Sequence, residues 1–332
     1  MTGCRHLAAG VALAALAAVS ACGGDHGQSR PAVDYELVSV GDPGNASDST
    51  GFGSVPYAYR IGKLDVTIGQ YTAFLNAVAA SDTHALYSPS MATDLNSAGI
   101  SRAGSAGSYT YDAMDNEGSS ANRPITYVSW LDAARFANWM SNGQPRGAQD
   151  ASTTENGAYD LSGSSGIAAV ARNAVNPNTG AAPTFFIPLE NEWYKAAYFD
   201  PTLSGGAGGY HLYATRSSTG PGNVIGDGAN QANSVAAGLL CVTQSPNYST
   251  TQNYLTDVGA FSDSASFYGT FDQSGNVWEW NDLDGAPSAS RGLRGGYWFA
   301  AAIPMQSVLY SSDTVTREDN GAGFRLASPA AP

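Results

Sequence analysis

Charged side chains are scarce in this 332-residue chain, and cations are the scarcest of them. Asp, Glu, Lys and Arg make up 13% of the residues, with 15 Lys and Arg against 28 Asp and Glu, and the formal charge is -13 at pH 7. An acidic chain without a basic cluster repels the phosphate backbones of DNA and RNA. We therefore expect no nucleic acid among its partners.

Cysteine and histidine are also rare, with three and four copies. Cys4 and Cys22 lie in the amino-terminal segment, which leaves Cys241 alone, and a lone Cys is usually a small buried apolar residue. His84 and His211 are far apart in the sequence and belong to no metal-binding motif. The sequence therefore requires no disulfide and indicates no histidine metal centre.

The amino terminus has the pattern of an export signal. Arg5 and His6 precede an apolar run from Leu7 to Ala18, and Val19-Ser20-Ala21-Cys22 resembles the lipobox of bacterial lipoproteins. The run is shorter than the roughly 20 residues that a membrane-spanning helix needs. We expect a lipoprotein signal peptide over 1–21, lipidation of Cys22, a flexible tether over 22–35 and a folded domain over 36–330. The protein would then sit in the bacterial cell envelope, at the outer membrane or surface, held by its lipid alone. The alternative is an ordinary secretory signal.

Short elements in a loop-rich domain are expected from the 39 Gly and 16 Pro, which interrupt helices and strands. A strand is predicted over 57–63, and Thr67 and Ser129 are predicted to cap two helices with apolar faces. A third, short helix is predicted over 190–198, where Glu190 and Glu192 favour the helix start. The segments 81–121, 144–178 and 200–253 are predicted as loops, with a possible strand at 159–161.

One stretch, Gly269 to Trp280, concentrates two Trp, two carboxylates and two Gly in twelve residues. Together with five other blocks it resembles the formylglycine-generating enzyme (sulfatase-modifying factor) family, over about residues 35–328. The blocks are Tyr59-Arg60-Ile61-Gly62-Lys63-Leu64-Asp65-Val66-Thr67, Pro124 to Ala133, Ile187-Pro188-Leu189-Glu190-Asn191-Glu192-Trp193, Gly275 to Trp280, Arg294-Gly295-Gly296 and Gly323-Phe324-Arg325. The resemblance implies an α+β fold, a variant of the C-type lectin fold with short strands and two main helices.

Oxidase activity does not follow from this resemblance. Family members that make formylglycine carry two Cys after the Gly-Gly block, which bind copper as thiolates, and Ala300 and Met305 stand at those positions here. Alanine cannot bind a metal, and one thioether cannot replace two thiolates. We expect no copper and no formylglycine-generating oxidase, while another enzymatic activity stays open.

A structural Ca²⁺ is a further implication of the resemblance. The matching positions are the side chains of Asp272 and Glu279 with the carbonyls of Gly275 and Val277, and a second site would use Asn233 and the Ser234 carbonyl. Oxygen ligands of this kind suit Ca²⁺. The alternative is that Asp272 caps a turn while Glu279 pairs with Arg294 or Arg325.

A ligand-binding cleft is expected after the Gly-Gly turn, where the family has its active site. Its residues would be Tyr297, Trp298, Phe299, Met305 and Tyr310, and core packing is the alternative for them. Trp278 and Trp280 are expected in the core. Three hypotheses remain: a binding module for a protein or glycan ligand, an enzyme of the same superfamily with an unidentified metal-dependent activity on an exported substrate, and a surface display protein diversified by a retroelement.

Overall fold

The two longest helices begin at reciprocal capping residues. Helix α1 (Ile68–Val78) follows Thr67, whose hydroxyl accepts the Gln70 N–H while the Gln70 side chain accepts the Thr67 N–H. Helix α3 (Trp130–Ser141) follows Ser129, which exchanges the same two bonds with Asp132. Each pair satisfies backbone donors that the first turn leaves free. Both predicted helix starts are confirmed.

The third helix, α4 (Glu190–Tyr198), has the predicted bounds. Glu192 Oε2 accepts the Leu189 N–H at 2.7 Å, so this carboxylate caps the helix start as expected. Trp193, Tyr194 and Tyr198 turn inward from α4 and form a cluster with Ala214. The short helices are α2 (Ser90–Thr93), α5 (Leu203–Gly206) and the 3₁₀ turn η1 (Ile303–Met305).

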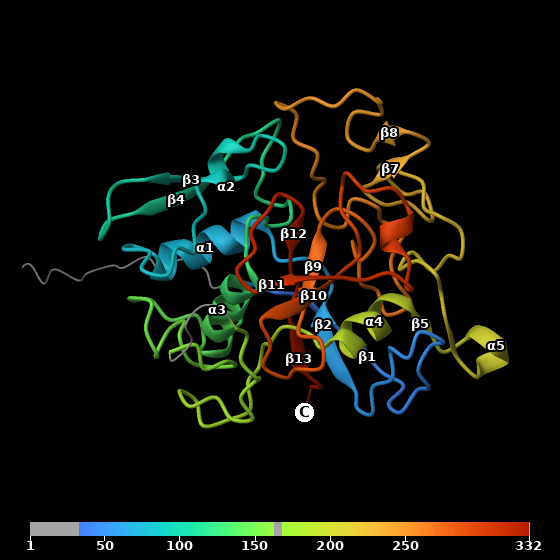
Figure 1. The fold of residues 1–332 in the computed structure, drawn as a ribbon, viewed down its shortest axis with the longest axis horizontal. Helices are drawn as coiled ribbons and strands as arrows, with labels where there is room; N and C mark the ends of the chain where they lie inside the picture. Colours follow the sequence, from blue (N-terminus) through green and yellow to red (C-terminus); the bar gives the residue numbers. More distant parts are fainter. Residues whose placement is uncertain (1–32, 163–167, 332) are drawn as a thin grey trace, which may run out of the picture. The chain divides into compact units, whose positions relative to one another are not determined.

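Two small sheets lie at the centre of the domain (Figure 1). The first has the order β1-β2-β13, with β1 (Leu37–Val40), β2 (Tyr59–Gly62) and β13 (Ala327–Pro329), all antiparallel. The second has the order β11-β10-β9-β12, with β9 (Trp278–Asn281), β10 (Ser290–Arg294), β11 (Ser311–Thr314) and β12 (Ala322–Gly323), and only its β9–β12 pair is parallel. The last strand, β13, therefore joins the carboxy-terminal part of the domain to its first strands.

Three hairpins lie in segments that were predicted as loops. They are β3 (Ile100–Ala103) with β4 (Thr110–Ala113), β5 (Phe199–Asp200) with β6 (Gly209–Tyr210), and β7 (Val235–Ala236) with β8 (Leu239–Leu240). The β3–β4 hairpin was missed because most of its residues are exposed and polar, so the sequence shows no clear alternation. The strand predicted at 159–161 was wrong, because Tyr159 makes only one isolated bridge, to Arg172.

The main core lies between α1, α3 and the two sheets. Phe136 of α3 packs edge-on against Phe324, with 5.5 Å between ring centroids, and Trp280 is fully buried as predicted. Trp278 packs on the same core but is only partly buried. The α+β class with short strands and two main helices is confirmed.

This computed structural model describes residues 33–162 and 168–331. The predicted signal peptide over 1–21, the lipidation site Cys22 and most of the tether lie outside the described residues. Within the described ranges, no helix combines the length and apolar character needed to cross a membrane.

Candidate functional site

The Gly-Gly turn after β10 depends on both glycines. Gly295 and Gly296 have φ values of 99° and 73°, in the left-handed region that other residues rarely adopt. A Cβ on Gly296 would lie 2.8 Å from Met305 Cγ, and one on Gly295 would lie 3.2 Å from the Gln273 carbonyl oxygen. The turn therefore brings the chain after β10 directly over Met305.

The positions of the two family thiols are buried beneath this turn. Ala300 is 7% exposed and Met305 is fully buried, in a cluster with Tyr213 and Ala232. Cys241 is buried elsewhere, as predicted, and burial raises the pKa of its thiol to about 12. No pair of thiolates is therefore available to copper in the described part of the chain.

The five residues of the expected cleft separate into buried and exposed groups. Trp298 is 3% exposed and stacks on Tyr254, with 5.0 Å between ring centroids and 6° between planes, while Met305 is buried. These two belong to the core, as the alternative interpretation held, and cannot touch a ligand at the surface. Phe299 and Tyr310 are 45% and 59% exposed, and Tyr297 is partly buried.

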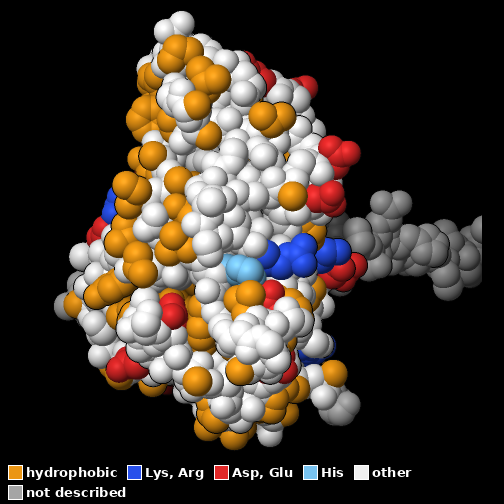
Figure 2. Space-filling model, turned by 90° about the vertical axis from the view of Figure 1, so that its right-hand side faces the viewer, with side chains coloured by type: hydrophobic (Ala, Val, Ile, Leu, Met, Phe, Trp, Pro, Cys, Tyr) orange, Lys and Arg blue, Asp and Glu red, His pale blue; other side chains and the backbone are white. Residues whose placement is uncertain are grey.

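Exposed hydrophobic side chains gather along the segment that follows the turn. We call Phe299, Ile303, Val308, Leu309 and Tyr310 the 299–310 surface; they are between 38% and 62% exposed. η1 is on the right of Figure 1, and Figure 2 shows that side of the molecule. Hydrophobic side chains run down the left half of that view, where charged side chains are few (Figure 2).

A buried arginine holds the backbone of this surface in place. Arg294 Nη1 donates to the carbonyls of Ser307 at 2.7 Å and Leu309 at 2.8 Å, and its Nε pairs with Glu190. The guanidinium carbon also lies 5.5 Å from the ring centroid of Tyr310. Arg294 is therefore the residue that positions the 299–310 surface. The sequence placed Arg294 before the Gly-Gly pair but did not indicate this role.

Tyr297 lines a separate pocket of about 380 Å³. Trp278 and Tyr297 supply aromatic walls, and Ser311, Arg317 and Asn320 supply polar groups. Arg317 pairs with Asp313 and Asp319, so the rim of the pocket has a fixed guanidinium. Aromatic walls with polar groups around them can bind a sugar ring or a small polar molecule.

The residues predicted to bind Ca²⁺ lie close together but have other partners. Arg325 binds both carboxylate oxygens of Glu279, and Trp193 Nε1 donates to Oε2 at 2.8 Å. Asp272 Oδ2 accepts the Gly259 N–H at 2.7 Å, and burial raises the pKa of Asp272 to about 6. A guanidinium thus occupies the place of a cation at Glu279, so these residues as arranged do not fit a calcium site. The pairing of Glu279 with Arg325 is the alternative considered above. Calcium binding at Asp272 and Glu279 stays a prediction.

The second predicted calcium position is also used inside the protein. The Asn233 side chain donates to the Tyr254 carbonyl at 2.8 Å and to Asn276 Oδ1 at 3.0 Å, and the Asn233 backbone carbonyl accepts the Asn276 N–H. The Ser234 carbonyl accepts from the Asn223 side chain at 3.0 Å. Across the described ranges, no group of three or more His, Cys, Asp or Glu side chains could hold a metal ion.

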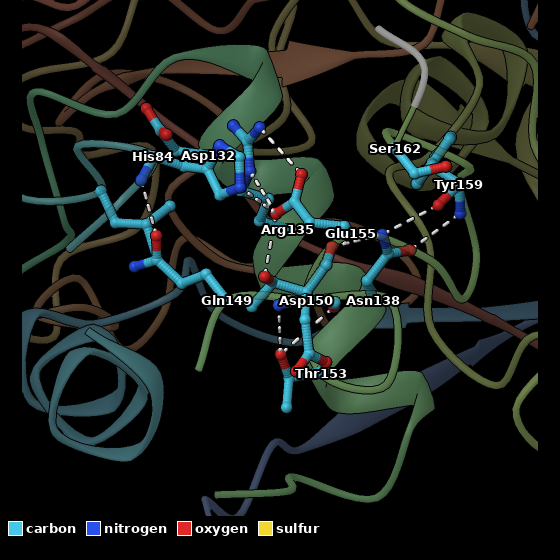
Figure 3. Close-up of polar contacts among 12 residues, drawn as sticks. His84, Asp132, Arg135, Asn138, Gln149, Asp150, Thr153, Glu155, Tyr159 and Ser162 are labelled. Atoms are coloured by element: carbon cyan, nitrogen blue, oxygen red, sulfur yellow. Dashed lines mark hydrogen bonds and ion pairs between the residues drawn. The ribbon is translucent and has the colours of Figure 1, made fainter. Parts of the chain in front are cut away.

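A polar cluster around α3 contains one of the two histidines considered above (Figure 3). Arg135 donates to both oxygens of Glu155, at 2.8 and 3.1 Å, and His84 Nε2 lies 3.5 Å from Glu155 Oε1 (Figure 3). Burial lowers the pKa of His84. The Thr154 hydroxyl donates to Glu155 Oε1 at 2.9 Å. The cluster ties two loops to α3.

Comparison with known proteins agrees with this loop-rich α+β domain, a variant of the C-type lectin fold. Residues 53–330 match the family described as the sulfatase-modifying factor enzyme 1-like domain, and the chain belongs to that family. No curated protein matches the chain in sequence.

Several solved structures are similar at low sequence identity. CarF is 20% identical, with a TM-score of 0.47 over 90% of this chain and 99% of CarF. Variable protein 1 of Treponema denticola is 17% identical, with a TM-score of 0.46 over 90% of this chain and 96% of that protein. PvdO of Pseudomonas aeruginosa is 16% identical, with a TM-score of 0.43 over 89% of this chain and 92% of PvdO.

Proposed function

We propose that this protein is a lipid-anchored binding module of the bacterial envelope, without oxidase activity, and that the 299–310 surface binds a protein ligand. One observation carries the proposal. Ten large hydrophobic residues are exposed in the described part of the chain, and five of them, Phe299, Ile303, Val308, Leu309 and Tyr310, fall within twelve consecutive positions. Clusters of this kind on a polar surface are typical of interaction sites.

The chemistry of the 299–310 surface favours a protein over a glycan. Ile303, Val308 and Leu309 are aliphatic and are 62%, 50% and 38% exposed. Sugars bind through aromatic stacking and directed hydrogen bonds, whereas branched aliphatic side chains gain free energy when another apolar surface removes them from water. We therefore assign this surface to a protein ligand.

Paired substitutions test this assignment. The Ile303→Ser/Val308→Ser variant should lose its partner in a pull-down from envelope extracts, because two apolar contacts are replaced by hydroxyl groups. The matched control is Val175→Ser/Val224→Ser, at exposed positions outside the segment. Equal recovery of every partner by the parent and the Ile303→Ser/Val308→Ser variant would rule out the proposed surface.

The Tyr297 pocket supports a second candidate, a glycan ligand. Trp278 and Tyr297 supply ring faces, while Ser311, Arg317 and Asn320 supply hydrogen-bonding groups. Tyr297→Ala should abolish retention on a glycan array and leave protein capture by the 299–310 surface unchanged. If the parent protein retains no glycan, this candidate is excluded.

Anchoring through Cys22 is the other half of the proposal, and it rests on the lipobox-like pattern at Val19 to Cys22. Cys22→Ser should move the protein from the membrane fraction to the soluble fraction, since the lipid would be its only membrane attachment. Mass spectrometry of the mature amino terminus would detect the lipid on the parent protein. A parent protein without a lipid at Cys22 would contradict this part.

A further inference from the structure

A pocket of about 370 Å³ lies beside β2 and the start of α4, and no residue of the 299–310 surface lines it. Tyr57, Arg172, Asn173 and Glu192 supply polar groups, and the remaining lining is mostly small or apolar, with Phe186 and Pro183 among it. Its size is within the range of pockets that bind small molecules, about 300 to 1,000 Å³.

Arg172 is the unusual group in this pocket. Its guanidinium carbon lies 3.7 Å from the centroid of the Phe186 ring, which fixes the plane of the fork. Its Nη1 is buried and has no hydrogen-bond partner among the residues that the structure describes. In the described ranges, no ion pair joins Arg172 to a carboxylate. A buried donor without a partner is unfavourable, so a ligand acceptor that bonds to it would stabilise the complex.

Other polar groups of the pocket are already paired, and the Asn173 side chain donates to Asn156 Oδ1 and to the Gly157 carbonyl. Glu192 Oε1 accepts from the Tyr57 hydroxyl at 2.9 Å, and Oε2 accepts the Leu189 N–H. Burial beside Glu192 raises the pKa of Tyr57 to about 12, so the hydroxyl keeps the proton that it donates. Arg172 also interacts with Tyr57 and Glu192, and its Nη1 is the donor in this pocket that lacks a partner among the described residues.

We propose that this pocket binds a monocarboxylate that carries a small apolar group, through the planar fork of Arg172. Guanidinium and carboxylate form two parallel hydrogen bonds, and the alanine, proline and phenylalanine walls would cover the apolar part. Glu192 lies in the same pocket, so a doubly charged phosphate would meet a nearby carboxylate, and a single negative charge is preferred. A free carboxylic acid and a peptide carboxyl terminus share this chemistry.

Binding of defined probes to the full chain tests the proposal. Ligand-observed NMR titration should show N-acetylleucine binding at least tenfold more tightly than N-acetylleucinamide, and inorganic phosphate binding more weakly than N-acetylleucine. The tripeptide acetyl-Ala-Ala-Leu distinguishes the two sources: tighter binding than N-acetylleucine identifies a peptide terminus, and equal binding identifies a free acid. Equal affinity for the acid and its amide would overturn the proposal.

Two variants show whether Arg172 is responsible. Arg172→Gln should remove the preference for the acid over the amide, whereas Arg146→Gln, the same change at an exposed arginine, should keep it. Ala182→Trp fills the pocket from its exposed edge without changing Arg172 and should weaken N-acetylleucine at least tenfold. Parent-like binding by a folded Arg172→Gln protein, checked by its melting temperature, would place the carboxylate elsewhere.

Discussion

At the scale of single residues, the most consequential contact of the Gly269–Trp280 stretch is the ion pair that Glu279 makes with Arg325. Both side chains are fully buried, and Arg325 also binds Asp65 at 2.8 Å. Replacing Glu279 by Gln leaves Asp65 to balance the charge of Arg325, but a buried donor loses its acceptor, which costs about 1 to 3 kcal/mol. Glu279→Gln should therefore lower the free energy of unfolding by about that amount in urea denaturation. Glu36→Gln, which breaks an exposed pair with Lys63, should cost about 1 kcal/mol or less.

The calcium prediction can be tested directly. If Ca²⁺ binds at Asp272 and Glu279, EDTA should lower the melting temperature of the purified protein and added Ca²⁺ should restore it, because a bound ion stabilises the folded state. Calcium-saturated EDTA is the control. An unchanged melting temperature would contradict the prediction and agree with Arg325 as the cation at Glu279.

The sequence alone shows which metal-binding side chains are absent, but it does not show which residues are buried or which contacts they make. Ala300 and Met305 exclude paired thiolates from the sequence alone. The sequence could not show that Trp298 and Met305 are buried, because an aromatic or thioether side chain suits either a core or a surface. Nor did it single out Arg172, whose stacking on Phe186 joins positions 14 residues apart across an irregular loop.

At the scale of elements, the capping box of α3 gives a prediction about pH. Burial raises the pKa of Asp132 to about 6, although hydrogen bonds from Ser129 oppose the shift. The unfolded chain loses this proton near its ordinary value of about 4, so the folded state holds it over a higher range. The contribution of this proton to stability is thus fully present below about pH 4 and is lost as pH rises through 6.

Asp132→Asn should remove this pH dependence while the side-chain carbonyl still accepts the Ser129 N–H. Between pH 4 and 7 the free energy of unfolding of the parent should fall, relative to that of the variant, by about 3 kcal/mol at most, since each pKa unit corresponds to about 1.4 kcal/mol. Urea denaturation across this range measures it. Parallel pH profiles for both proteins would contradict the prediction.

Elements with local signals were predicted well, and those made by distant pairing were not. α1 and α3 start at capping residues that can be recognised in the sequence, and Glu190 and Glu192 mark the first turn of α4. Strands such as β12 and β13 have two and three residues, too few for a period, and they form because β9 and β2 accept their hydrogen bonds. The arrangement of these strands could therefore be predicted only from the resemblance to a known family, and not from the local sequence of each strand.

At the scale of the whole domain, β13 closes the structure by pairing with β2 and with Phe186. Ala327 and Phe186 exchange two backbone hydrogen bonds, of 2.7 and 3.0 Å. Ala327→Pro removes the Ala327 N–H and leaves the buried Phe186 carbonyl without a donor, so it should lower the free energy of unfolding by about 3 kcal/mol. Ala330→Pro, at an exposed position just beyond β13, should cost much less. Equal melting temperatures for the two variants would show that β13 is not needed to close the domain.

The attachment of Ser307 and Leu309 to Arg294 has a consequence for evolution. Arg294 binds the carbonyl groups of this segment, which every amino acid possesses, so these two bonds do not depend on the side chains displayed at positions 308 and 309. Descendants of this gene could exchange those side chains one after another and acquire new ligands, while inheriting the same fold.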